Sequence, residues 1–276
     1  MRNTKIYNFT IQEKVTLIDL LAKETELSKQ SLKRYLKNGA VWYKKKGRKK
    51  FERARRASLE LFVGTKVQFY YNPHLEKIES TPIELIYESR HWGVWYKPVN
   101  ILSHGTKFAD EGAVERQLQQ LGKKDVYLVH RLERETAGLI LVSYDKTLAS
   151  KFSDIWASTK IEKKYLVEVR GDLVEGDKDK VIDAVLEGKK AETYFRVIEA
   201  REKTTLVEAT LPTGKVQQLK SYFADLGHPI VGDRKFGRGK KDSEEIKLVA
   251  YKLKVTDPVT NRVFNFEVPE EKLEHI

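Results

Sequence analysis

The sequence has no cysteine, a single methionine and no apolar run long enough to cross a bilayer. Without cysteine, disulfide bonds, thiolate nucleophiles and cysteine-based zinc sites are excluded, so oxygen and nitrogen side chains must carry any chemistry. The N-terminal stretch MRNTKIYNFTIQEK also lacks the apolar core of a secretion signal. We therefore expect a cytoplasmic protein that does not contact a membrane.

Positive charge is concentrated in the first 80 residues. Residues 1–80 contain 19 Lys or Arg and 8 Asp or Glu, a net charge of +11, whereas residues 81–276 contain 33 against 32. With 276 residues, 40% of them hydrophobic, the chain can bury a full core. The asymmetry predicts a basic N-terminal module that binds a polyanion and a nearly neutral body with a different task.

Two short helices followed by strands are expected in the basic module. Apolar residues within positions 17–21 fall on one helical face, and a second helix is expected between an N-cap at Ser28 and a stop at Gly39. Alternating apolar residues then predict strands at residues 40–43 and 61–69.

A basic run lies between these two strands. Nine of the thirteen residues 44–56 are Lys or Arg. A charge run by itself usually marks a solvated face, but this run follows a basic helix, which favours phosphate binding by both segments. The candidate phosphate-binding residues are Lys29, Lys33, Arg34, Lys37, Lys44, Lys45, Lys46, Arg48, Lys49 and Lys50.

The order of helix, helix and strand, with LSKQSLKRYLKNGAVWY at its centre, resembles the small αL RNA-binding domain shared with small-subunit ribosomal protein four. The resemblance covers about residues 13–71. It implies an RNA-binding domain at residues 1–75. Asn72-Pro73 and Pro82 indicate a linker at residues 76–82, so we expect a larger catalytic domain at residues 83–276.

Many short strands and few helices are expected in the larger domain. Strands are predicted on both sides of a turn at residues 90–93, and at residues 126–129, 139–142, 164–169, 193–198, 205–209, 248–253 and 263–268. Helices are predicted at residues 113–121, 147–158 and 216–226. The pattern predicts an α+β fold, a large mixed and mainly antiparallel sheet with flanking helices, preceded by the small helix-helix-strand domain.

Three segments carry polar residues that a fold alone does not require: residues 130–136, the pair Lys164-Tyr165 and residues 213–237. They offer a carboxylate in Glu133, a cation in Lys220 and an aromatic ring in Tyr165.

Metal and nucleotide sites fit these residues poorly. His104, His130 and His228 lack the short spacing of zinc ligands on a helix, and no glycine-rich phosphate loop is present. A retaining glycosidase needs two carboxylates, and Asp233 is a candidate for the second, but the sequence does not place it near Glu133.

Motifs in a consistent order resemble the RluA-type pseudouridine synthases. They are YKPVNILSH, HRLERETAGLILV, EKKYLVEVRG, KAETYFRVI, LPTGKVQQLKSYFADLGHPIVGDRKFG and LVAYKLKVTDPVT. In that family the central loop reads His-Arg-Leu-Asp, followed by Thr-Ser-Gly. The resemblance spans roughly residues 83–270 and implies an enzyme that breaks the N-glycosidic bond of a uridine in RNA, rotates the uracil and rejoins it through carbon five, without a cofactor.

The resemblance also implies a role for each site residue. A uridine in folded RNA must be flipped out of its stack, which leaves a gap for Arg131 to fill and a base for Tyr165 to stack on. Glu133 would attack the ribose or take a proton from it, and Lys220 would keep this carboxylate ionised. We expect no metal, a partner RNA that is rRNA or tRNA, and a monomeric protein.

The site departs from the family pattern at its centre, where Glu133 replaces an aspartate. One added methylene moves the carboxylate by roughly 1 Å, and such a misplacement can cost on the order of a hundredfold in rate. Lys220 replaces an arginine, Ala137 a serine, Gln217 a histidine and Asn100 a glycine. Two hypotheses follow: an active synthase in which Glu133 and Lys220 compensate each other, or an RNA-binding pseudoenzyme of the same fold.

Overall fold

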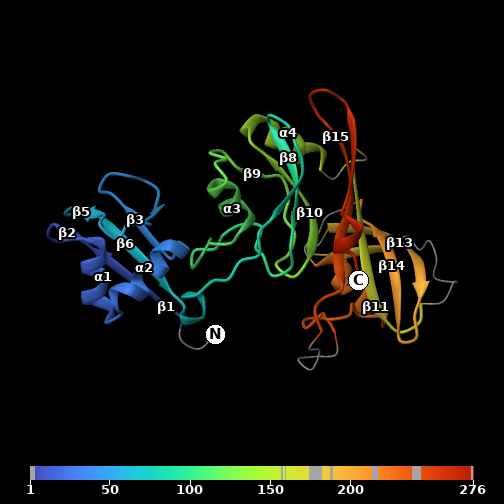
Figure 1. Ribbon diagram of the computed structural model, residues 1–276, viewed down its shortest axis with the longest axis horizontal. Coiled ribbons are helices and arrows are strands. Elements are labelled where there is room, and N and C mark those ends of the chain that lie inside the picture. Colours follow the sequence, from blue (N-terminus) through green and yellow to red (C-terminus); the bar gives the residue numbers. More distant parts are fainter. Residues whose placement is uncertain are drawn as a thin grey trace. The chain divides into compact units, whose positions relative to one another are not determined.

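The computed structural model describes residues 4–156, 158, 160–173, 182–186, 189–212, 217–237, 244–274 and 276. The chain divides into two compact units (Figure 1). The first comprises Met1–Pro82 and His104–Gln120, and the second comprises Ile83–Ser103 and Leu121–Ile276. The domain boundaries expected at residues 75 and 82 remain a prediction.

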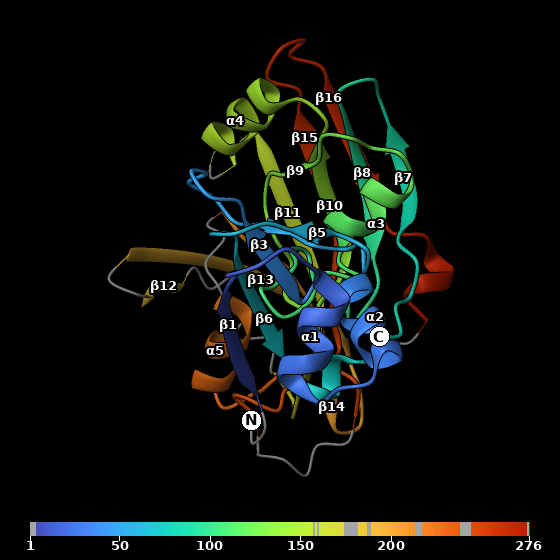
Figure 2. The same cartoon turned by 90° about the vertical axis from the view of Figure 1, so that its left-hand side faces the viewer.

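The first unit combines two adjacent helices, α1 (Leu17–Thr25) and α2 (Lys29–Asn38), with a small antiparallel sheet (Figure 2). The sheet has the order β1 (Lys5–Thr10), β6 (Lys66–Tyr71), β3 (Val41–Lys44) and β4 (Glu52–Arg53). A separate strand pair joins β2 (Val15–Thr16) to β5 (Glu60–Leu61), and the helices η1 (Pro73–Leu75) and α3 (Val114–Gln120) complete the unit.

The expected limits of α2 are confirmed. The Ser28 hydroxyl accepts a hydrogen bond from the Ser31 N–H at 3.1 Å, and the helix ends at Gly39, whose φ is +80°. The apolar faces of α1 and α2 bury Leu17 and Leu32 against Phe69 of β6. Burial of these faces therefore holds both helices on the sheet.

The second unit is built on one ten-stranded sheet. Its order is β12 (Ile182–Leu186), β13 (Lys189–Ala200), β14 (Thr204–Thr210), β11 (Ile161–Arg170), β15 (Leu248–Thr256), β10 (Ala137–Ser143), β8 (Trp92–Lys97) and β7 (Glu84–Glu88), with β16 (Val263–Glu267) on β15 and β9 (Tyr127–Leu128) on β10. Only β10 and β15 pair in parallel among the described strands. The expected α+β fold with a mainly antiparallel sheet is confirmed.

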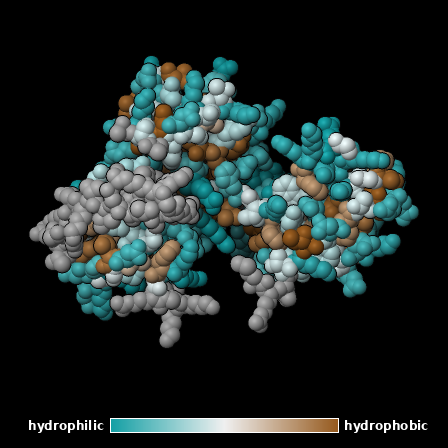
Figure 3. All heavy atoms as spheres, turned by 180° about the vertical axis from the view of Figure 1, so that it is seen from behind, coloured by the Kyte–Doolittle hydropathy of each residue, from teal (hydrophilic) through white to brown (hydrophobic). Residues whose placement is uncertain are grey.

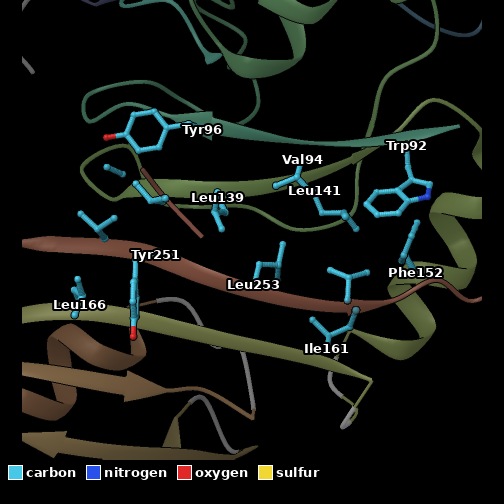
Figure 4. Close-up of a cluster of buried hydrophobic side chains, with 14 of the residues drawn as sticks. Trp92, Val94, Tyr96, Leu139, Leu141, Phe152, Ile161, Leu166, Tyr251 and Leu253 are labelled. Carbon is cyan, nitrogen blue, oxygen red and sulfur yellow. The ribbon is translucent and has the colours of Figure 1, made fainter. Parts of the chain in front are cut away.

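Two of the three helices expected in the larger domain flank this sheet, α4 (Lys146–Ile155) and α5 (Gln218–Asp225). The third, expected at residues 113–121, is α3 of the first unit, and the short η3 (Glu270–Lys272) was not expected. Val216, the first residue of the helix expected at 216–226, lies outside the described residues. Figure 4 shows one core, in which Trp92 and Leu141 from the sheet meet Phe152 of α4. A second core packs Phe223 of α5 against Val167 of β11.

The parallel contact between β10 and β15 requires a glycine. Gly138 pairs with Ala250 and has φ +123°, and a Cβ atom at this position would lie 2.3 Å from the Ala250 carbonyl oxygen. No other residue type allows this approach without a backbone shift. Because Gly138 follows the loop that carries Glu133, this contact fixes where the loop ends.

The surface seen in Figure 3 is largely hydrophilic, with hydrophobic residues scattered across it. No helix in the described part of the chain is both long and apolar enough to span a membrane.

Candidate active site

Glu133 lies in the loop between β9 and β10, and backbone contacts hold this loop. The buried hydroxyl of Ser103 donates a hydrogen bond to the Leu132 carbonyl at 2.8 Å and accepts one from the Leu132 N–H at 3.1 Å. The Thr136 N–H donates to the Glu133 carbonyl at 3.2 Å, which closes a turn. The backbone on either side of the carboxylate is therefore fixed.

Lys97 holds the same loop through its fully buried ammonium group. Its Nζ donates hydrogen bonds to the carbonyls of Pro98 at 3.1 Å, Ile101 at 2.8 Å and Arg134 at 3.3 Å. Burial lowers the pKa of Lys97 to about 7. Asn100, in the connected turn, has φ +63°. Asparagine tolerates this left-handed conformation, which explains how it replaces the glycine of the RluA-type pattern.

His130 has a structural role. Its Nε2 accepts a hydrogen bond from the Leu141 N–H at 2.9 Å, and its ring stacks on Trp156 with centroids 4.0 Å apart. Burial and the nearby Lys163 charge lower the pKa of His130 to about 3. A ring nitrogen that accepts a backbone hydrogen bond carries no proton, so His130 is unsuited to donating one at neutral pH.

Lys220 reaches the Glu133 carboxylate from the first turn of α5. Its side chain is 3% exposed, and its Nζ lies 2.8 Å from Glu133 Oε2. It also lies 2.7 Å from Oε2 of Glu135. Burial alone would lower the pKa of Lys220, but the two carboxylates outweigh it and raise the pKa above its ordinary value. Lys220 is therefore a cation at neutral pH.

The second oxygen of Glu133 is unpaired. Glu133 Oε1 is buried and has no hydrogen-bond partner among the described residues. A buried carboxylate oxygen without a partner is costly, and such groups call for a functional explanation. One oxygen of Glu133 is thus held by Lys220, and the other has no partner among the described residues.

Tyr165 reaches the site through an irregularity in β11. The pairing of β11 with β15 shifts register between Lys164 and Tyr165, as at a β-bulge, and bulges re-aim side chains. Burial, together with the Glu133 charge, raises the pKa of Tyr165 to about 12. The phenol therefore stays protonated at neutral pH and offers a neutral ring.

A cavity of about 100 Å³ brings the predicted site residues together. It is lined by Arg131, Leu132, Glu133, Thr136, Tyr165, Leu211, Gln217, Gln218, Leu219, Lys220 and Leu248. Glu133 is the single carboxylate among these lining residues, and Asp233 is not one of them. Instead, the Asp233 carboxylate accepts hydrogen bonds from the N–H groups of Lys235 and Phe236 at 2.8 and 3.2 Å. This arrangement disfavours the two-carboxylate glycosidase.

From the sequence, no role was predicted for Glu135, and Gln217 was identified only as the replacement of a histidine. Glu135 lies two residues after Glu133, in a stretch where any of several charged residues could pair with Lys220. Gln217 has φ +59° immediately before α5, and its side chain accepts a hydrogen bond from Lys235 Nζ. A left-handed conformation at a residue other than glycine is not visible in a single sequence.

The predicted phosphate-binding residues lie in the first unit, in α2, at the end of β3 and in the turn joining β3 to β4. Lys29 pairs with Asp19 at 2.6 Å and Arg34 pairs with Glu76 at 2.8 Å, so a phosphate would compete with these carboxylates. Lys44 lies over the Phe51 ring. The exposed members are Lys29, Lys33, Lys37, Lys45, Lys46, Arg48, Lys49 and Lys50.

Two arginines near the end of the basic run, Arg53 and Arg55, share one partner. Arg53 and Arg55 both pair with Asp110, at 2.9 and 2.5 Å. These two arginines bind the 104–120 segment within the first unit and share the single negative charge of Asp110.

Comparison with known proteins identifies the family. Residues 91–225 match the family described as RNA pseudouridylate synthase. The ribosomal large subunit pseudouridine synthase C of Escherichia coli is 30% identical over 223 residues, which cover 72% of this chain and 70% of that protein. The chain belongs to the RNA pseudouridine synthase family.

Other members of the RNA pseudouridine synthase family agree with this assignment. An uncharacterized RNA pseudouridine synthase of Aquifex aeolicus is 27% identical over 307 residues, covering 98% of this chain and 95% of that protein. The structure of human RNA pseudouridylate synthase domain containing 1 covers 70% of this chain and 86% of its own, with a TM-score of 0.59 and 21% identity, and confirms the fold. The resemblance to RluA-type synthases, which are isomerases, is confirmed. The likeness of the N-terminal module to an αL domain remains a prediction.

Proposed function

We propose that this synthase isomerises a uridine in ribosomal RNA and that Glu133 supplies the reacting carboxylate. The observation that carries the proposal is the ion pair between Glu133 and Lys220 in a cavity that Tyr165 also lines. The choice of rRNA over tRNA is supported by relatives in Escherichia coli and Nitrosomonas europaea, both named for the large ribosomal subunit. The cytoplasmic location and the monomeric state remain predictions.

The arrangement of the cavity fits the requirements of a flipped uridine. Arg131 is exposed and lines the cavity, a place from which a side chain can fill the gap left in the RNA. The neutral Tyr165 ring offers a stacking surface for the uracil. The unpaired Oε1 of Glu133 then attacks the ribose carbon that carries the uracil, or takes a proton from the ribose, while Lys220 stabilises the charge on Oε2. In either case the glycosidic bond breaks and the uracil leaves with its electron pair.

The replacement of aspartate by Glu133 fits together with the replacement of arginine by Lys220. A longer carboxylate side chain reaches further, and a lysine presents a compact charge on a flexible stem that adapts to the new position. The 2.8 Å separation shows that the two side chains meet. Reaction at a displaced carboxylate is thus compatible with the geometry.

The test is a map of pseudouridine in total RNA from cells that lack the protein, complemented with wild type, Glu133→Gln or Glu267→Gln. Glutamine keeps the shape of residue 133 and removes its charge. The target pseudouridine should therefore be missing from the RNA of cells that carry Glu133→Gln and present in those that carry wild type or Glu267→Gln. The control Glu267 pairs with Lys252 away from the cavity. If loss of the protein leaves the pseudouridine map unchanged, the result favours the pseudoenzyme. If the missing pseudouridine lies in tRNA, the substrate is tRNA and not rRNA.

A further inference from the structure

Lys220 is held by two carboxylates, of which the reaction requires one. Its Nζ lies 2.8 Å from Glu133 and 2.7 Å from Glu135. The two acids differ in exposure, because the Glu133 side chain is 24% exposed and the Glu135 side chain is 56% exposed. Glu133 lines the cavity, whereas Glu135 is not among the lining residues. Glu135 therefore binds the ammonium from outside the reaction space.

A lysine needs such a second partner more than an arginine would. A guanidinium group is a rigid fork that holds a carboxylate through two parallel hydrogen bonds, whereas an ammonium group is a point charge at the end of four rotatable bonds. With Glu133 as its only partner, Nζ could take several positions around the carboxylate. The second short contact restricts it, because Nζ must satisfy Glu133 and Glu135 together.

We propose that Glu135 is a positioning residue that holds the Lys220 ammonium against Glu133. The inference rests on the proposed function, since it assigns a task within that reaction. Glu135 does not touch the substrate. It compensates for the loss of the arginine fork and takes part of the Lys220 charge, which leaves the three groups with a net charge of −1.

Other titratable and charged groups surround the pair. Lys220 of α5 faces Glu133 and Glu135 of the loop. Tyr165 lies beside Glu133. The charges of Arg134 and Arg234 act on Glu135. The hydrogen bond from Lys220 is the main cause of the lowered pKa of Glu135. Removing the Glu135 charge should in turn let Lys220 lose its proton at a lower pH.

The test compares Glu135→Gln with Glu267→Gln, a matched control whose glutamate is 57% exposed and pairs with Lys252 at 3.0 Å. For Glu135→Gln we expect kcat on the target RNA to fall on the order of tenfold with KM unchanged, a smaller loss than a 1 Å displacement of the reacting group would cause. The alkaline limb of its kcat–pH profile should move to lower pH. Glu135→Asp, which keeps the negative charge, should have a kcat between those of Glu135→Gln and wild type.

The Lys220→Arg background separates positioning from a general effect of charge. Because a guanidinium fork orients itself, Glu135→Gln should cost less in Lys220→Arg than in wild type. Equal losses in both backgrounds, or a Glu135→Gln profile identical to that of Glu267→Gln, would overturn the inference.

A second readout keeps the inference independent of turnover. The Nζ resonance of Lys220 can be followed by NMR in protein labelled with ¹⁵N-lysine and is assigned by its absence from Lys220→Arg. The pH at the midpoint of its titration should fall in Glu135→Gln and stay unchanged in Glu267→Gln. If wild type makes no pseudouridine but this titration shifts, the proposed function fails and the pairing stands. If the titration does not shift, the inference fails whatever the activity.

Discussion

The carboxylate of Glu133 shares one oxygen with Lys220 and keeps the other unpaired. Nζ lies 2.8 Å from Oε2, and Oε1 is buried without a hydrogen-bond partner among the described residues. The cation therefore pairs with the acid without occupying both of its oxygens. The unpaired oxygen belongs to a side chain that lines the same cavity as Tyr165.

The match between Glu133 and Lys220 can be tested by restoring the family pair. If Glu133 and Lys220 compensate each other, Glu133→Asp should be no faster than wild type, because the shorter side chain draws away from Lys220. The double variant with Lys220→Arg should recover more rate than the two single changes predict together. The measurement is single-turnover pseudouridine formation on the mapped RNA. A gain of activity by Glu133→Asp alone, from an inactive wild type, would indicate the pseudoenzyme instead.

Tyr165 can be tested through RNA affinity. Tyr165→Phe keeps the ring and should bind the target RNA like wild type, whereas Tyr165→Ala should lose roughly 1–3 kcal/mol of base stacking. Fluorescence anisotropy with the target RNA measures both variants. Equal affinity of the Phe and Ala variants would mean that no flipped base rests on this ring.

The basic turn between β3 and β4 should supply affinity for RNA phosphates. Neutralising Lys44, Lys45, Lys46, Arg48, Lys49 and Lys50 should weaken binding and flatten its salt dependence, since each lost phosphate contact lowers the slope of log K against log salt by roughly 0.7–0.9. Filter binding at several salt concentrations gives the slope. Changing the exposed Lys146, Lys151 and Lys160 of the second unit to glutamine is the control. A slope equal to that of wild type would remove these residues from the RNA interface.

His130 should make the protein sensitive to mild acid. Its folded-state pKa of about 3 lies below the ordinary value of 6.5. Between pH 3 and pH 6.5 the unfolded chain therefore binds a proton at His130 that the folded chain does not bind. The stability that this group contributes is present above pH 6.5 and falls as pH drops towards 3, by up to about 1.4 kcal/mol per pH unit.

His130→Gln offers a carbonyl oxygen to the Leu141 N–H and does not titrate. Denaturant unfolding between pH 7.5 and 5.5, a range above most carboxylate titrations, should show a shallower loss of stability in this variant than in wild type. Identical pH dependence in the two proteins would mean that His130 is protonated without cost, contrary to its hydrogen bond with Leu141.

Local sequence signals were sufficient for most elements of the fold. Ser28 and Gly39 mark the ends of α2 because capping depends on a few neighbouring residues. Short apolar runs likewise indicate β10, in which every residue is buried, and β14, in which the five central residues are buried. β1 was not expected, because its sequence KIYNFT leaves most residues exposed and its pairing with β6 joins distant parts of the chain.

Some features of the candidate site likewise follow from the sequence, and others follow only from the tertiary structure. The sequence alone determined the motif around Glu133, and thereby the family, because motif order is a property of the chain. Only the tertiary structure decided that Lys220 lies between Glu133 and Glu135, that Lys97 is buried beneath the loop, and that one Glu133 oxygen is unpaired. These facts depend on distances between segments far apart in sequence, and on burial, which sets the strength of every charge interaction.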